Sequence, residues 1–112
     1  EKRGGYQFSG QDVYLNIAGG LKVNDPAADL GVTLALVSSF LDKPISNKVA
    51  FLGEVGLGGE VRTVNKIDHR LTEINKLGFG HAIIPKSNTV QDNSDLKTSG
   101  VANISSAIKK AL

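Results

Sequence analysis

The sequence predicts a single α/β domain over residues 1–112, in the two-layer α+β arrangement. Segment 12–18 alternates apolar and polar residues, as a half-buried strand does, and segment 49–55 is an almost continuous apolar run typical of a buried strand. Segments 27–41 and 67–77 carry apolar residues at helical spacing. Because strands and helices alternate along the chain, we expect them to pack in layers around one core.

The N-terminal part is expected to form two strands and then a helix. A pair of glycines after the first strand is expected to turn the chain into a second strand over 21–23. Asp25 suits the capping position and Pro26 the first position of the helix that follows. Apolar side chains cover most of the circumference of helix 27–41, so we expect this helix to be mostly buried.

The middle part is expected to form a hairpin and a second helix. The run 49–55 is expected to be a central strand that turns through a glycine-rich segment into a short strand at 60–62. Helix 67–77 is expected to end at Gly78 and to bury one stripe of side chains, namely Ile67, Leu71, Ile74 and Leu77. Its outer face is expected to carry Asp68, Arg70, Glu73 and Lys76.

The C-terminal part is expected to contain two more strands and a last helix. Residues 82–85 form an apolar run that ends at a proline, which indicates a buried strand. Residues 86–99 are polar and are expected to form a loop before a short strand over 101–104. Ser105 is expected to cap the terminal helix.

The composition excludes several classes of protein. With no cysteine, the chain has no disulfide scaffold, no thiolate zinc site and no cysteine nucleophile. No apolar run approaches the length of about 18 residues that crosses a membrane, and a location in the cytoplasm is expected. The net charge is +2, so any binding of nucleic acid must use a local basic patch. The chain contains no methionine and is expected to be a fragment of a longer protein.

The residues that could carry chemistry form no catalytic or metal-binding pattern in the sequence. The glycines between Gly53 and Gly59 lack the lysine and hydroxyl of a phosphate loop, so we expect a tight turn there. His69 and His81 have no second ligand at helical spacing, so no metal site is expected. No serine lies in a G-x-S-x-G context, and the sequence pairs no nucleophile with a base.

Two stretches of the sequence carry a resemblance to known families. Two runs separated by a helix resemble segments of Lon-type protease domains. They are Gly53-Glu-Val-Gly-Leu-Gly-Gly-Glu-Val-Arg-Thr-Val64 and Leu77-Gly-Phe-Gly-His-Ala-Ile-Ile-Pro-Lys-Ser-Asn88. Upstream, the pattern QD-x-Y-x-N-x-x-GG-x-K-x-x-x-PA-x-DL resembles the C-terminal domain of the bacterial RadA family. The resemblance runs from about residue 1 to the end. It implies a Lon-protease-like domain of the ribosomal-protein domain 2-like fold, lacking its first strands.

The departures from the Lon-type pattern concern the catalytic residues. Lon-type proteases are expected to carry a serine nucleophile in a P-S-A-G context, and the matching stretch here places Ala27 at that position. Their lysine base opens the helix after the hairpin, where this sequence has Asp68. The resemblance therefore implies that this chain has no catalytic residues and is not an enzyme. An active Lon-type serine peptidase is kept as an alternative.

The resemblance also implies what the parent protein does. RadA-like proteins carry a zinc-binding N-terminal region and a RecA-like ATPase core, and as hexameric rings they drive branch migration in homologous recombination and DNA repair. Their Lon-like domain is expected to be a scaffold that stabilises the ring and helps to hold DNA. No cofactor is expected in this chain, while ATP, Mg and Zn are expected to bind the parent outside it. The implied partners are copies of itself, single-stranded or branched DNA and a RecA-like recombinase, without a membrane. A stand-alone protein-interaction domain is the other alternative.

Four basic residues are candidates for contact with DNA. Arg62 lies at the exit of the hairpin, Lys66 and Arg70 lie at the start of the following helix, and Lys86 follows the strand 82–85. If they share one edge of the domain, they would contact phosphates without distinguishing base sequences. The alternative is that they are scattered, solvated surface charges.

Overall fold

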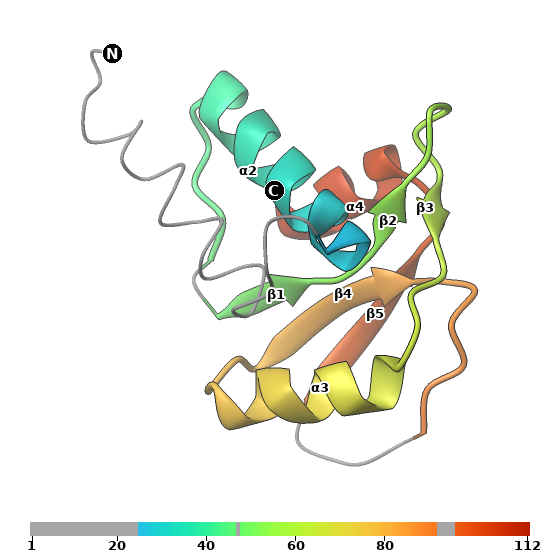
Figure 1. The fold of residues 1–112 in the computed structure, drawn as a ribbon. Helices are drawn as coiled ribbons and strands as arrows, with labels where there is room; N and C mark the ends of the chain where they lie inside the picture. Colours follow the sequence, from blue (N-terminus) through green and yellow to red (C-terminus); the bar gives the residue numbers. More distant parts are fainter. Residues whose placement is uncertain (1–24, 47, 92–95) are drawn as a thin grey trace.

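In the computed structural model a mixed α/β domain is described for three stretches of the chain, residues 25–46, 48–91 and 96–112. The middle layer is a sheet in the order β1 (Val49–Phe51), β4 (His81–Pro85) and β5 (Lys97–Val101) (Figure 1). Both pairs of neighbours are parallel. The strands expected over 12–18 and 21–23 lie outside the described residues.

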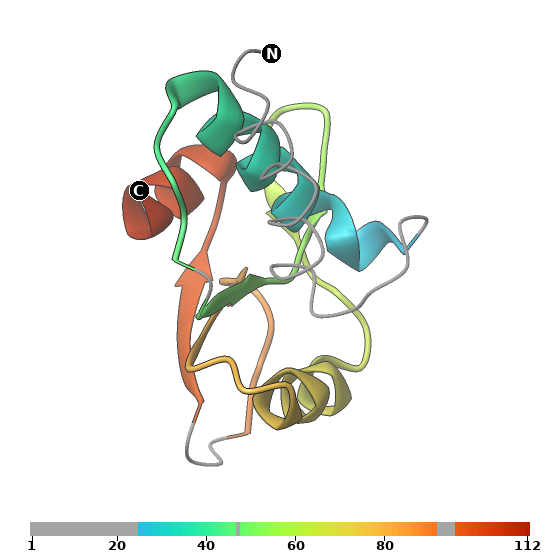
Figure 2. The same ribbon diagram turned by 90° about the vertical axis from the view of Figure 1, so that its left-hand side faces the viewer.

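Helices cover both faces of this sheet. α2 (Asp29–Leu41) and α4 (Ile104–Ala111) lie on one face, and α3 (Ile67–Lys76) lies on the other (Figures 1 and 2). The α/β class is confirmed. The described part of the chain has three layers, because helices cover both faces of the sheet, whereas two layers were expected. None of the helices in the described part of the chain is long and apolar enough to cross a membrane.

The middle strand β4 divides the core into two apolar clusters because successive side chains of a strand point to opposite faces. Ile83 joins the cluster under α2 and α4, which also contains Leu30, Leu34, Phe51 and Val101. Ala82 and Ile84 join the cluster against α3, which also contains Leu52, Ile67, Leu71 and Ile74. The predicted strand 82–85 is confirmed with one further residue at its start.

The helix expected from Ala27 begins with a tighter turn. Residues Pro26–Ala28 form the 3₁₀ helix η1, and α2 follows directly from Asp29. The cap is as predicted, since Oδ1 of Asp25 accepts a hydrogen bond from the N–H of Ala27 at 3.0 Å.

The expectation that this helix is mostly buried is wrong. Leu30 and Leu34 are fully buried against the sheet, but Leu36 is 66% exposed and Phe40 is 88% exposed. The apolar residues cover most of the circumference of the helix, whereas the sheet touches only one side of it. Composition alone therefore overestimated the burial of α2.

The apolar run 49–55 is not one central strand. β1 ends at Phe51 and lies beside β4, which is the middle strand of the described sheet. The chain leaves the sheet at Gly53, whose N–H donates to the carbonyl oxygen of Ala27 at 3.0 Å and whose carbonyl accepts from the N–H of Leu30 at 2.9 Å. After this, β2 (Glu54–Val55) pairs with β3 (Val61–Arg62) in the antiparallel hairpin that the sequence predicted.

Three further boundaries differ from the expectation. α3 ends at Lys76 and Leu77 is 58% exposed, although Gly78 provides the expected stop with a φ of +95°. The last strand begins at Lys97, within the segment expected to be a loop, and α4 begins at Ile104, within the segment expected to be a strand. The cap of α4 is Asn103, whose Oδ1 accepts from the N–H of Ser106 at 2.8 Å, so the expected cap Ser105 is wrong.

Replacing Gly53 by alanine is expected to destabilise the domain by about 1–2 kcal/mol, the cost of overpacking a filled site. A Cβ at Gly53 would lie 2.7 Å from Cγ1 of Val61, so the start of α2 and the hairpin would have to move apart. Gly80→Ala is the matched control, because a Cβ there meets nothing within 4 Å. Urea unfolding measures both variants, and equal midpoints for the two would contradict the packing described here.

Candidate functional site

A hollow of about 300 Å³ lies beside Ala27, the residue at the position of the Lon-type nucleophile. Four parts of the chain form its walls: the start of η1, strand β2, the segment that joins β3 to α3, and α3 itself. Side chains and backbone of eight residues line it, namely Asp25, Pro26, Ala27, Glu54, Thr63, Val64, Asn65 and Arg70. These residues lie far apart in the sequence, so the hollow exists only in the folded domain.

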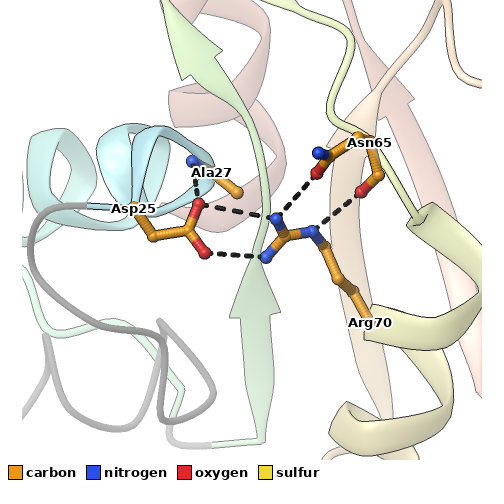
Figure 3. A network of polar contacts seen from close by, with 4 residues as sticks. All are labelled: Asp25, Ala27, Asn65 and Arg70. Carbon is orange, nitrogen blue, oxygen red and sulfur yellow. Dashed lines mark hydrogen bonds and ion pairs between the residues drawn. The ribbon is translucent and has the colours of Figure 1, made fainter.

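Arg70 reaches from α3 across this hollow to Asp25 (Figure 3). Its Nη1 donates to Oδ2 of Asp25 at 3.0 Å, and its Nη2 donates to Oδ1 at 3.5 Å. Nε donates to the carbonyl oxygen of Asn65 at 2.9 Å, and Nη2 also donates to Oδ1 of Asn65 at 2.9 Å. Because Asp25 also accepts from the N–H of Ala27, the guanidinium ties the start of η1 to the start of α3.

This ion pair is largely shielded from solvent, with 16% of the Arg70 side chain and 25% of the Asp25 side chain exposed. Burial by itself raises the pKa of Asp25, but the N–H of Ala27 and the guanidinium of Arg70 outweigh burial and hold the pKa below the usual 3.8. The expectation that Arg70 lies on the outer face of its helix is therefore wrong. Its side chain folds back toward the start of α3, as helical side chains tend to do, and meets two acceptors there.

Asn88 joins the two segments that resemble Lon domains. Its Oδ1 accepts from the N–H of Val64 at 3.0 Å, and its Nδ2 donates to the carbonyl oxygen of Val64 at 3.0 Å. Next to it, the hydroxyl oxygens of Thr63 and Ser87 are 2.7 Å apart and share a hydrogen bond. These contacts hold one wall of the hollow. They also give a structural reason for the asparagine that ends the second segment, since its amide satisfies both backbone groups of Val64.

The two residues at the Lon-type catalytic positions have structural contacts. The methyl group of Ala27 is buried in the cluster against α3, and the carbonyl of Ala27 accepts from the N–H of Gly53. Asp68 does not line the hollow, and its Oδ1 accepts from the N–H of Gln91 at 3.1 Å. The α3 side chain at the hollow is that of Arg70, whereas Asp68, at the position of the Lon-type lysine, lies outside the hollow.

The four candidates for DNA contact lie in different electrostatic surroundings. Nη2 of Arg62 lies 2.8 Å from Oε2 of Glu60 in an exposed ion pair, and this contact contributes to lowering the pKa of Glu60, after the effect of the backbone of Glu60 itself. Arg70 is paired with Asp25. Lys66 and Lys86 are exposed and form no ion pair with the described carboxylates. Thr63 and Ser87 bring the neighbourhoods of Arg62 and Lys86 together, while Arg70 faces the hollow.

The structure also pairs a serine with a histidine, which the sequence analysis did not predict. Nε2 of His81 lies 2.8 Å from Oγ of Ser99, because β4 and β5 are adjacent in parallel register. Burial, and then the charges of Lys97 and Lys110, lower the pKa of His81 and so favour the neutral form of its ring. Within the described chain no carboxylate bonds to this ring, so the pair lacks the third group that orients a catalytic histidine.

Metal binding has no support in the part of the chain that the structure describes. His69 is exposed on α3, and the described His, Asp and Glu side chains nowhere gather in a group of three that could hold an ion.

Comparison with known proteins defines the class to which this domain belongs. Residues 2–88 match the family described as subunit ChlI of Mg-chelatase, and the chain belongs to that family. The matched segment contains both the hollow beside Ala27 and the Asn88 contact.

Within that class, the chain is homologous over its whole length to proteins named DNA repair protein RadA. It is 45% identical over 112 residues to the Synechocystis sp. protein, covering 100% of this chain and 22% of that protein. It is 45% identical over 114 residues to the Listeria monocytogenes protein and 43% identical over 114 residues to the Bacillus subtilis protein, in each case covering 100% of this chain and 25% of the relative. The chain thus spans about a quarter of the length of these curated relatives.

Proposed function

We propose that this chain is the non-proteolytic, Lon-like scaffold domain of a RadA-type DNA-repair ATPase. It has, in this proposal, the ribosomal-protein domain 2-like fold. It supports assembly of a hexameric ring and contacts single-stranded or branched DNA during recombination. ATP, Mg and Zn bind other parts of the parent protein, which acts in the cytoplasm with a RecA-like recombinase.

The proposal is supported by the match of the entire chain to relatives named for DNA repair. The hollow beside Ala27 supports the non-proteolytic part. A serine peptidase needs a serine hydroxyl with a base in hydrogen-bond reach, and here position 27 is an alanine and the central contact is an ion pair between Arg70 and Asp25. This contact ties the start of η1 to the start of α3, so its role in the domain is structural.

The ion pairs refine the proposed contact with DNA. Arg62 and Arg70 each have a carboxylate partner, and that partner cancels much of the attraction for a phosphate. We therefore expect Lys66 and Lys86 to supply most of the DNA contact among the four proposed residues, and Arg70 to supply the least.

Incubation of the chain with unfolded casein and with short fluorogenic peptides is expected to show no cleavage above buffer. Ala27→Ser is expected to be equally inactive, because Asp68 bonds to Gln91 and Arg70 is held by Asp25. An active serine protease serves as the positive control. Cleavage that survives repurification, together with labelling of the chain by a serine-reactive inhibitor, would overturn the proposed function in favour of a peptidase.

A further inference from the structure

A second group of cations surrounds His81, separate from the four residues proposed above. Lys97 begins β5 and is the register partner of His81 in β4. Lys110 lies in the last turn of α4. Both lysines are exposed, and neither forms an ion pair with a carboxylate in the part of the chain that the structure describes.

The topology brings these groups to one face of the sheet. Residues two apart in a strand point the same way, so Lys97 and Ser99 lie on the face where Val101 packs under α4. His81 lies on this face too, since its ring meets the hydroxyl of Ser99 at 2.8 Å. Lys97 is the register partner of His81, and Lys110 lies on α4, which packs on this face. The charges of both lysines, after burial, lower the pKa of His81.

Two more exposed lysines lie on neighbouring parts of the chain. Lys109 precedes Lys110 in α4 and is exposed. Lys48 is exposed, and its carbonyl oxygen accepts from the N–H of His81 at 3.3 Å. Like charges gathered on one face repel one another, and a bound polyanion would relieve that repulsion.

We infer that Lys97 and Lys110, with the hydroxyl of Ser99, form a phosphate-binding surface that contacts the DNA backbone. This inference rests on the proposed function, because it names where a DNA-repair domain would hold its nucleic acid. Ammonium groups and serine hydroxyls are common partners of backbone phosphates, and such contacts do not depend on base sequence. His81 positions Ser99 through the contact of its ring with the hydroxyl, and the two lysines carry the attraction.

The test compares two double variants that remove the same charge from different surfaces. K97A/K110A removes two unpaired lysines from the surface around His81, and K66A/K86A removes two from the surface proposed earlier. Binding of a fluorescently labelled duplex and of a single strand is measured by anisotropy at several salt concentrations. For duplex DNA, K97A/K110A is expected to weaken binding at least about tenfold at low salt and to flatten the log–log salt dependence by up to about 1.8, whereas K66A/K86A changes both less.

The other outcomes separate this inference from the proposed function. If K66A/K86A weakens binding as much as or more than K97A/K110A, the inference is wrong and the proposed function stands. If the unchanged chain binds no DNA at low salt, both the inference and the proposed DNA contact are wrong. Binding to phosphatidylserine vesicles in place of DNA would also overturn the inference. Urea unfolding of each variant establishes that a loss of binding is not a loss of folding.

Discussion

Replacing Leu34 by alanine is expected to lower the free energy of unfolding by about 2–5 kcal/mol, the range for truncation of a fully buried leucine. Leu34 is 0% exposed and belongs to the cluster of Leu30, Phe51 and Ile83, where α2 meets the sheet. The loss of its methyl groups leaves a cavity that the rigid sheet cannot close. Urea or thermal unfolding measures the change.

Leu36→Ala is the matched control, with the same substitution on the same helix. Leu36 is 66% exposed, so little apolar contact is lost and alanine favours the helix at least as well. We expect the free energy of unfolding to change by no more than about 0.5 kcal/mol, as for other surface positions. If Leu36→Ala were as damaging as Leu34→Ala, the placement of α2 on the sheet would be wrong.

The sequence predicted the elements whose pattern reflects local chemistry. The Asp25 cap, the glycine stop at Gly78 and the hairpin of β2 and β3 follow from backbone rules that act over a few residues, and the structure confirms all three. The arrangement of helices on the two faces of the sheet depends on contacts between distant segments, so the sequence predicted it less well. β5 is polar over most of its length and is held by its pairing with β4, so its composition resembled a loop.

In the candidate site, too, the local motifs were predicted from the sequence and the contacts between distant residues were not. The motif residues identified the position of Ala27, and the homology to DNA repair protein RadA confirms the resemblance. The residue facing Ala27 was not found, because Arg70 lies 45 positions from Asp25 and helical periodicity placed it with solvated charges. Likewise, the pairing of His81 with Ser99 depends on the parallel register of two strands, which the sequence does not encode locally.

Replacing Arg70 by alanine is expected to lower the free energy of unfolding by about 2–3 kcal/mol, because Asp25 would remain charged and half-buried without its cation. The two hydrogen bonds of the guanidinium to Asn65 would be lost as well. Arg62→Ala is the matched control, since the Arg62–Glu60 pair is exposed to solvent and such pairs contribute little to stability. Equal effects of the two substitutions would contradict the shielding of the Arg70 contact.

The same contact predicts a dependence of stability on pH. The folded-state pKa of Asp25 lies below its usual 3.8, so the carboxylate contributes stability above that usual value and loses it as the pH falls through the folded-state pKa. The difference in stability between the unchanged chain and Asp25→Asn is therefore expected to be full at neutral pH and to shrink in the acid range. Asparagine keeps the capping oxygen, so the comparison isolates the charge.

In the proposed function, the hollow beside Ala27 joins η1 to α3 and performs no peptide hydrolysis. A double-mutant cycle on Asp25→Asn and Arg70→Ala, measured by urea unfolding at neutral pH, tests it most directly. We predict a coupling energy above about 1 kcal/mol, because each substitution removes the partner of the other. If the two effects simply add, or if Arg70→Ala gains cleavage of casein, the two residues do not form such a joint and the scaffold interpretation fails.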